Sequence, residues 1–270
     1  MMIKQVNSKI LLLTLLLIPF NQLFMNYLLK EKFFDPLKIA TNYLIQPTLV
    51  VNILSLVIFS LIIFGLGKLN LGAIFITRKK MYQGITLILC IWVLSQIISL
   101  SLSAILTRDV IYSENPNENI GSFVGQFFGN AAFEELIYRG FFFTQLFLLL
   151  RKKTNNWKAL IASIILSQLL FALIHIPNRL MINQVDNLAS ELIKLFIIGV
   201  VLTIIYARST NLIFLIGVHS LINVPLNFLE PVFPVELIIF IITIIIALFW
   251  NKIITQGKNP FLQKTDSGSE

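Results

Sequence analysis

Charged residues are scarce in this sequence. Asp, Glu, Lys and Arg make up 13% of the 270 residues, whereas 57% of the residues are hydrophobic. Roughly a quarter of a typical globular sequence is charged, so this composition excludes an ordinary soluble domain. The net charge of +8 does not indicate a nucleic-acid partner, because the basic residues cluster between hydrophobic stretches, as in the cytoplasmic loops of membrane proteins.

The residues and motifs of several familiar catalytic sites are also missing. The one cysteine, Cys90, lies inside an apolar run, which excludes an internal disulfide, and we expect its side chain to pack within the protein. No serine has a Gly-x-Ser-x-Gly context, and the sequence contains neither a His-Glu-x-x-His zinc motif nor a phosphate-binding glycine loop. These absences leave the two histidines and a few acidic residues as candidates for chemistry.

Long apolar runs dominate the chain instead. Runs of about 20 residues recur along it, which is the length of helix that spans a bilayer core. We therefore predict an all-α, polytopic membrane protein with about eight transmembrane helices, over residues 10–29, 43–66, 84–106, 123–150, 158–176, 189–207, 211–229 and 235–250.

The chain is predicted to form one transmembrane domain over residues 1–255, followed by a polar, disordered tail over residues 256–270. If the N-terminus lies inside, most Lys and Arg residues fall in inner segments, which is the pattern of cytoplasmic loops. We therefore expect a multi-pass protein of the cell membrane, embedded in the lipid bilayer, with both termini in the cytoplasm.

The stretch FEELIYRG places two glutamates and an arginine inside the fourth apolar run. An ionisable side chain at that depth costs at least ~2.5–3.5 kcal/mol, so it indicates a function. Glu135 and Arg139 are four residues apart, which predicts an ion pair on one helix face. Glu134 lies about 100° around the helix and has no basic partner on its own helix. A structural clamp between helices is the alternative interpretation, but Glu134 also suits a base or a metal ligand.

Both histidines of the chain lie in apolar runs as well. His175 follows Phe171 by four residues, and His219 precedes Asn223 by four, so each pair shares a helical face. A lone buried histidine usually satisfies local hydrogen bonds. Two of them together with an unpaired glutamate supply what water activation needs, namely a base and donors for a developing oxyanion.

These residues resemble the motifs of the CAAX protease and bacteriocin-processing family of intramembrane endopeptidases, also called the Abi family. The resemblance covers about residues 120–230. The family pattern is Glu-Glu-x-x-x-Arg, then Phe-x-x-x-His, then His-x-x-x-Asn or Asp. The sequence supplies all three motifs in order, as Glu134-Glu135-Leu-Ile-Tyr-Arg139, Phe171-Ala-Leu-Ile-His175 and His219-Ser-Leu-Ile-Asn223.

The resemblance implies a cavity within the membrane, lined by the three motifs, and hydrolysis of a peptide bond by activated water without a covalent enzyme intermediate. It implies that Glu134 and His175 activate the water and that His219 and Asn223 stabilise the oxyanion. Arg139 would orient Glu135.

The cofactor and the substrate stay open. Glu134, His175 and His219 could bind a divalent metal such as zinc, although we favour a metal-free glutamate mechanism. The resemblance implies a peptide or lipidated-protein substrate: prenylated CAAX-type proteins, bacteriocin-like peptides or other membrane-associated peptides. The rival interpretations are a non-enzymatic bacteriocin immunity protein or membrane scaffold, and a small transporter with a proton relay, although transporters commonly contain inverted repeats and we find none here.

Overall fold

The computed structural model describes residues 4–106, 115–181, 187–227, 233–254 and 259–262, and within these ranges it is helical without β-strands. The longer helices are α1 (Ser8–Lys30), α3 (Pro47–Ser60), α4 (Arg78–Leu106), α8 (Asn156–Ile174), α10 (Leu188–Ser209), α11 (Leu212–Asn223) and α12 (Val235–Leu248). Shorter pieces are α2 (Asp35–Ala40), η1 (Leu61–Leu66), η2 (Leu71–Ile74), α9 (Ile176–Met181) and α13 (Trp250–Ile253).

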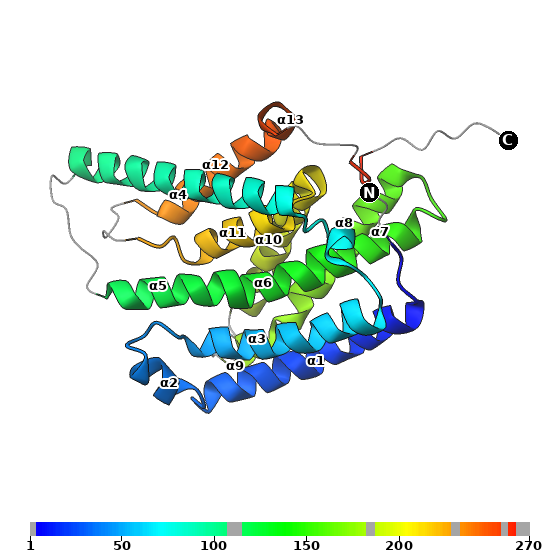
Figure 1. Ribbon diagram of the computed structural model, residues 1–270, viewed down its shortest axis with the longest axis horizontal. Coiled ribbons are helices and arrows are strands. Elements are labelled where there is room, and N and C mark those ends of the chain that lie inside the picture. The colour runs from blue at the N-terminus through cyan, green and yellow to red at the C-terminus, as the bar shows by residue number, and fades with distance from the viewer. Residues whose placement is uncertain (1–3, 107–114, 182–186, 228–232, 255–258, 263–270) are drawn as a thin grey trace.

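The fourth predicted span forms one unbroken rod, because the residues that join its segments keep helical backbone angles. Its segments are α5 (Pro116–Gly125), η3 (Gln126–Asn130), α6 (Ala131–Glu134), η4 (Glu135–Phe143) and α7 (Thr144–Leu150), of which η3 and η4 are π-helical. The rod crosses the middle of the molecule in Figure 1.

Among the described residues, five helical stretches are long and apolar enough to cross a membrane, namely Ser8–Lys30, Pro47–Leu66, Leu71–Leu106, Asn156–Met181 and Leu188–Ser209, and α11 and α12 are shorter apolar helices. Large apolar side chains such as Leu16 and Phe20 on α1 and Leu89 on α4 are exposed on the outside of the bundle. In water such a surface would be unfavourable, whereas in a bilayer it contacts lipid. The predicted all-α, polytopic membrane fold is confirmed.

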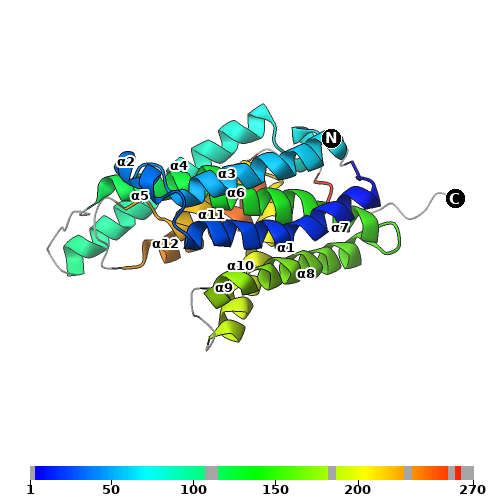
Figure 2. The same ribbon diagram turned by 90° about the horizontal axis from the view of Figure 1, so that it is seen from below.

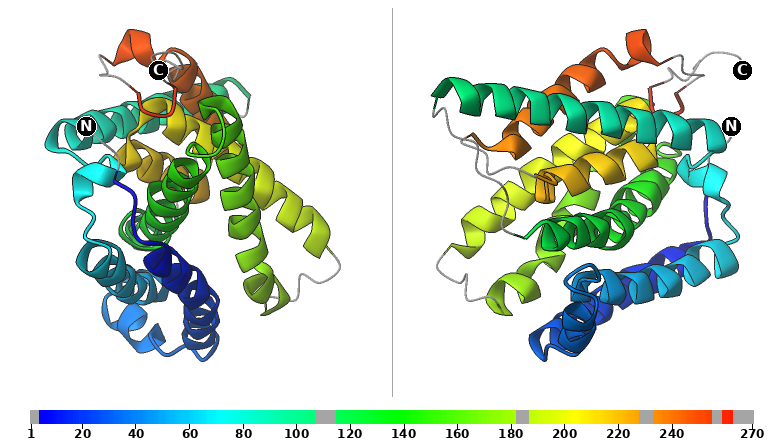
Figure 3. Two further views of the ribbon diagram at one scale, coloured as in Figure 1. Left: turned by 90° about the vertical axis from the view of Figure 1, so that its right-hand side faces the viewer. Right: turned by 60° about the vertical axis from the view of Figure 1, so that its left-hand side comes forward.

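Three groups of helices surround the central rod. Helix α3 packs along η3 and α6 with α1 packed on α3, the group α4, α11 and α12 lies on another side, and α8 and α10 pack together against η4. Figure 2 shows α8 and α10 set apart from the rest of the bundle, and the left view of Figure 3 shows the groups around the rod. Gly129 permits the close approach of α3, because a Cβ atom added there would lie 3.2 Å from the Cα atom of Leu49.

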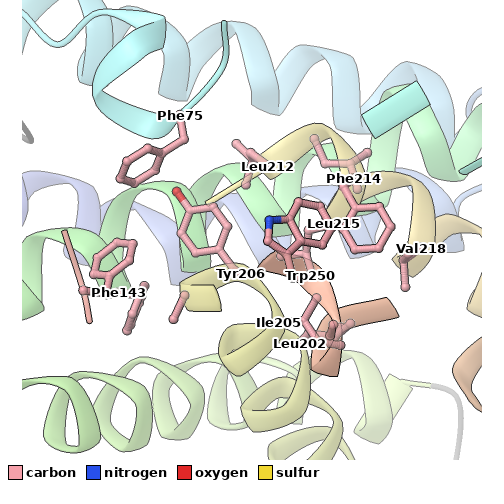
Figure 4. Packing of buried hydrophobic residues seen from close by; sticks show 14 of the residues in the cluster. Phe75, Phe143, Leu202, Ile205, Tyr206, Leu212, Phe214, Leu215, Val218 and Trp250 are labelled. Carbon is pink, nitrogen blue, oxygen red and sulfur yellow. The ribbon is translucent and has the colours of Figure 1, made fainter. Parts of the chain in front are cut away.

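An aromatic-rich core fixes the rod against its neighbours. Tyr206 of α10 lies edge-on to Phe143 of η4 and to Phe75, and Trp250 packs against Phe214 of α11. Figure 4 shows these rings filling the space between α10, α11 and the rod, together with aliphatic side chains. The core therefore fixes the elements that carry the predicted motifs in position relative to one another.

The seventh predicted span is shorter than expected. Helix α11 ends at Asn223, whereas residues 211–229 were predicted to form a span. Pro225 explains the difference, because a proline disfavours helical backbone in the preceding residue, and Val224 is extended with φ −141° and ψ 95°. Asn223 consequently sits at the last turn of α11.

Two further expectations differ from the structure. Cys90 is exposed on α4, so its predicted role in packing is wrong. Within the tail predicted to be disordered, Phe261 is 1% exposed and its ring lies against Phe143 and Phe147. Asn259 donates to the carbonyl of Ala207 over 2.8 Å. The sequence around Phe261 is polar and gave no indication of this apolar contact. Residues 255–258 and 263–270 of the tail lie outside the described ranges.

Candidate active site

The two glutamates stand where the rod changes from α-helix to π-helix. Glu134 is the last residue of α6 and Glu135 the first of η4. In a π-helix the hydrogen bonds run between residues five apart, so the turn is wider, and such turns are frequent at functional sites. The widening was not foreseen from the sequence, and it helps to set the directions of the adjacent carboxylates.

The predicted ion pair is present. The Nη1 atom of Arg139 lies 3.1 Å from Oε1 of Glu135, and both side chains are fully buried. The guanidinium group also lies over the ring of Phe171, 4.5 Å from its centroid, and Nε donates to Thr203 Oγ1 over 3.4 Å. The pair thereby ties η4 to α8 and α10.

Glu135 has a second partner that the sequence did not reveal. Its Oε1 atom lies 2.7 Å from Nδ1 of His219 on α11. An ionised carboxylate only accepts hydrogen bonds, so Nδ1 of His219 carries the hydrogen. This bond turns the Nε2 atom of His219 away from Glu135, and Glu135 therefore fixes both the tautomer and the orientation of the imidazole.

Glu134 faces both histidines. Its Oε1 atom lies 3.5 Å from Nε2 of His175, and its Oε2 atom lies 3.7 Å from Nε2 of His219. Both separations exceed a normal direct hydrogen bond, and a water molecule beside either pair of atoms can lie about 2.8 Å from both. The carboxylate is thus placed to share one water with an imidazole.

His175 is oriented by its own helix. It follows the last residue of α8, and its Nδ1 atom lies 2.7 Å from the carbonyl oxygen of Phe171. A carbonyl only accepts, so Nδ1 carries the hydrogen and Nε2 is the nitrogen that faces Glu134. The Phe-x-x-x-His spacing therefore places the carbonyl of Phe171 one turn before His175, where it selects the tautomer of the imidazole.

Asn223 completes the group of predicted residues. It lies one turn beyond His219 on α11, is exposed, and donates from Nδ2 to Oε1 of Gln126 over 3.0 Å. Gln126 belongs to η3 and was not singled out in the sequence. Its position eight residues before Glu134 on the same rod gave no motif signal.

One cavity of about 330 Å³ collects these side chains. Glu134, His175, His219 and Asn223 all line it, whereas Glu135 and Arg139 are buried behind its wall. The lining also contains amide side chains that the sequence did not indicate, and the apolar side chains of several helices. The amides are Gln22, Asn26, Asn52, Gln126, Asn130 and Asn178.

The candidate metal ligands do not form a metal site in this arrangement. Among the described residues, no group of three or more His, Cys, Asp and Glu side chains is placed to hold an ion. Oε1 of Glu134 lies 3.5 Å from Nε2 of His175, and Oε2 lies 3.7 Å from Nε2 of His219. The described arrangement thus gives no positive support to the three-ligand zinc site that we left open, which stays a prediction.

A polytopic helical bundle whose buried glutamate and two imidazoles share a cavity has the architecture of an intramembrane hydrolase. Comparison with protein families makes this more specific. Residues 116–225, which contain all three motifs, match the family described as type II CAAX prenyl endopeptidase Rce1-like. The family predicted from the motifs is confirmed, and it supports a CAAX-type intramembrane endopeptidase in general. No curated protein and no solved structure matches the chain.

Proposed function

We propose that this protein hydrolyses a peptide bond of a membrane-associated substrate with a water molecule activated by Glu134 and His175. The observation that carries the proposal is the position of the Glu134 carboxylate between two imidazoles. Each imidazole presents Nε2 to it, because each Nδ1 is engaged elsewhere.

Glu134 acts as the general base. A water held between Oε1 of Glu134 and Nε2 of His175 gives its proton to the carboxylate while its oxygen attacks the substrate carbonyl carbon. When the carbon–nitrogen bond breaks, the same proton passes from Glu134 to the leaving amine.

His219 and Asn223 stabilise the oxyanion that forms on the substrate carbonyl oxygen. Since Nδ1 of His219 already donates to Glu135, Nε2 can donate only when the ring is doubly protonated. The carboxylates of Glu134 and Glu135 lie on either side of this ring. Asn223 supplies the second donor after its amide leaves Gln126.

The cavity and the family match support a proposal for the substrate class. The lining combines the polar site with apolar side chains such as Met25, Leu29 and Leu195, which suits a peptide with an apolar portion. We propose prenylated CAAX-type peptides as the first class to test, with bacteriocin-like and other membrane-associated peptides as alternatives. We also propose that the protein lies in the cell membrane with both termini in the cytoplasm.

A fluorogenic, farnesylated CAAX peptide and its unprenylated counterpart, assayed with purified protein in detergent, test the proposal. Glu134→Gln keeps the shape of the side chain but removes the base, so kcat should fall ~10²–10⁴-fold. His175→Ala should match it, and Asn223→Ala should lose ~10²–10³-fold. Glu191→Gln is the matched control, since Glu191 pairs with Lys194 and does not line the cavity.

Wild-type turnover by Glu134→Gln would refute the assignment of the base. If neither the wild type nor any variant cleaves these peptides, and Glu134→Gln has no effect in cells, the immunity or scaffold role becomes the better interpretation.

A further inference from the structure

The part of the cavity wall formed by α1 and α3 carries two buried amides. Asn26 of α1 is 4% exposed and Asn52 of α3 is 1% exposed, and both line the cavity that contains Glu134. A contact between the two helices brings these amides to one wall, since Ser55 Oγ lies 3.0 Å from Met25 Sδ. Neither amide belongs to the three family motifs.

Each amide has one polar atom with a protein partner and one without. The Nδ2 atom of Asn52 donates to the carbonyl of Thr48 over 2.8 Å, and the Oδ1 atom of Asn26 accepts from Asn178 over 3.1 Å. Oδ1 of Asn52 and Nδ2 of Asn26 are buried and have no hydrogen-bond partner among the described residues. The wall therefore offers one unpaired acceptor and one unpaired donor, and buried groups of this kind require a partner.

The two amides contact residues that lie close in sequence to Glu134 and His175. The Cβ atom of Asn52 lies close to Gly129, 3.4 Å from where a Cβ would stand, and Gly129 is five residues before Glu134 on the rod. Asn178, the partner of Asn26, lies three residues beyond His175. A substrate bound by the amides is thus held by the same elements that carry the base and its histidine.

We infer that Asn26 and Asn52 bind the main chain of one extended substrate residue next to the scissile bond. Nδ2 of Asn26 donates to that residue's carbonyl oxygen, and Oδ1 of Asn52 accepts from its N–H. In an extended chain these two groups of one residue point to the same side, as they do in a hydrogen-bonded antiparallel pair. The inference rests on the proposed endopeptidase function and adds the way in which the substrate is recognised.

Recognition of this kind has a specific consequence. Neutral amides that bind the main chain are indifferent to the substrate side chain at that position, but they require its N–H group. Proline or an N-methylated residue has no such donor and should be rejected there. The amides therefore act as positioning groups for substrate binding, with broad sequence tolerance and one restricted position.

An ester scan tests the inference on the wild-type enzyme. In a series of cleavable peptides, one backbone amide at a time is replaced by an ester, always away from the scissile bond, which removes the N–H with little change in shape. At one position the ester should lower kcat/KM about fivefold to tenfold, mainly through KM, because one uniform binding contact is lost. If the ester has no effect at any position, the inference is refuted without recourse to a variant.

Variants then assign the contact. Asn52→Leu should reduce kcat/KM for the all-amide peptide by the same factor and should make the enzyme insensitive to the ester at that position. Asn26→Leu should weaken cleavage but remain sensitive to the ester. The matched control is Asn21→Leu, since Asn21 also bonds Ser55 between α1 and α3 but does not line the cavity. It should remain fully sensitive to the ester.

The failures of the two proposals are distinguishable. If cleavage depends on Glu134 but Asn52→Leu responds to the ester like the wild type, only the amide inference is overturned. If cleavage persists in Glu134→Gln, the proposed mechanism falls while the ester coupling can still be measured. If the wild type cleaves no peptide, both proposals fall.

Discussion

Replacement of Glu135, alone and together with Arg139, tests separately its contribution to stability and its contribution to catalysis. Its Oε1 atom lies 3.1 Å from Arg139 and 2.7 Å from His219, and its side chain is fully buried. Glu135→Leu leaves the Arg139 guanidinium buried with only long contacts, such as 3.5 Å to the carbonyl of Gly199. Breaking a buried pair in this way costs ~3–5 kcal/mol, so the variant should unfold at a clearly lower temperature.

The double variant Glu135→Leu/Arg139→Leu removes both buried charges. Replacement of a buried ion pair by apolar side chains is often neutral or stabilising, so thermal stability should return close to that of the wild type. His219 still lacks the carboxylate that accepts from Nδ1, and its tautomer and orientation are no longer set. We therefore expect kcat to remain at least about 10²-fold below wild type, as for a triad histidine without its acid.

Thermal unfolding in detergent and peptide hydrolysis are measured on the same preparations. The control is Glu191→Leu, alone and with Lys194→Leu, because that pair lies on the partly exposed side of α10 and its loss should leave the melting temperature close to that of the wild type. Recovery of activity in the Glu135/Arg139 double variant would show that Glu135 does not position His219. Unchanged stability of the single variant would remove the structural role of the pair.

Two other predictions concern the cofactor and the C-terminal segment. If Glu134 works without a metal, protein treated with strong chelators should keep full activity, whereas a zinc peptidase in the same buffer loses it; loss of activity that added zinc restores would refute the glutamate route. Phe261→Ala should lower the free energy of unfolding by ~3–5 kcal/mol, because its buried ring contacts Phe75, Phe143 and Phe147. Leu262→Ala, at a 47% exposed neighbour, is the control, and equal melting temperatures for the two variants would contradict the packing.

Local chemistry in the sequence determined the membrane class and the first contact of the site. Apolar runs of bilayer length form helices because no other open structure satisfies its backbone hydrogen bonds in lipid, and each predicted span contains a helix, although the seventh ends early at Asn223. The spacing of four residues between Glu135 and Arg139 places them on one face, and the ion pair follows. Both depend on interactions within one helix, which can be inferred from the spacing of residues along the sequence.

Only the tertiary structure decided how the separate motifs meet. His219 comes from α11, 84 residues after Glu135, and its place between the two glutamates depends on packing among α11, η4 and α8. The same holds for Asn26 and Asn52. In the sequence they are ordinary polar residues within apolar spans, and only the structure shows that they line the cavity and each have a buried, unpaired atom. Hydropathy and spacing describe one helix at a time, whereas a shared cavity is a property of how several helices pack.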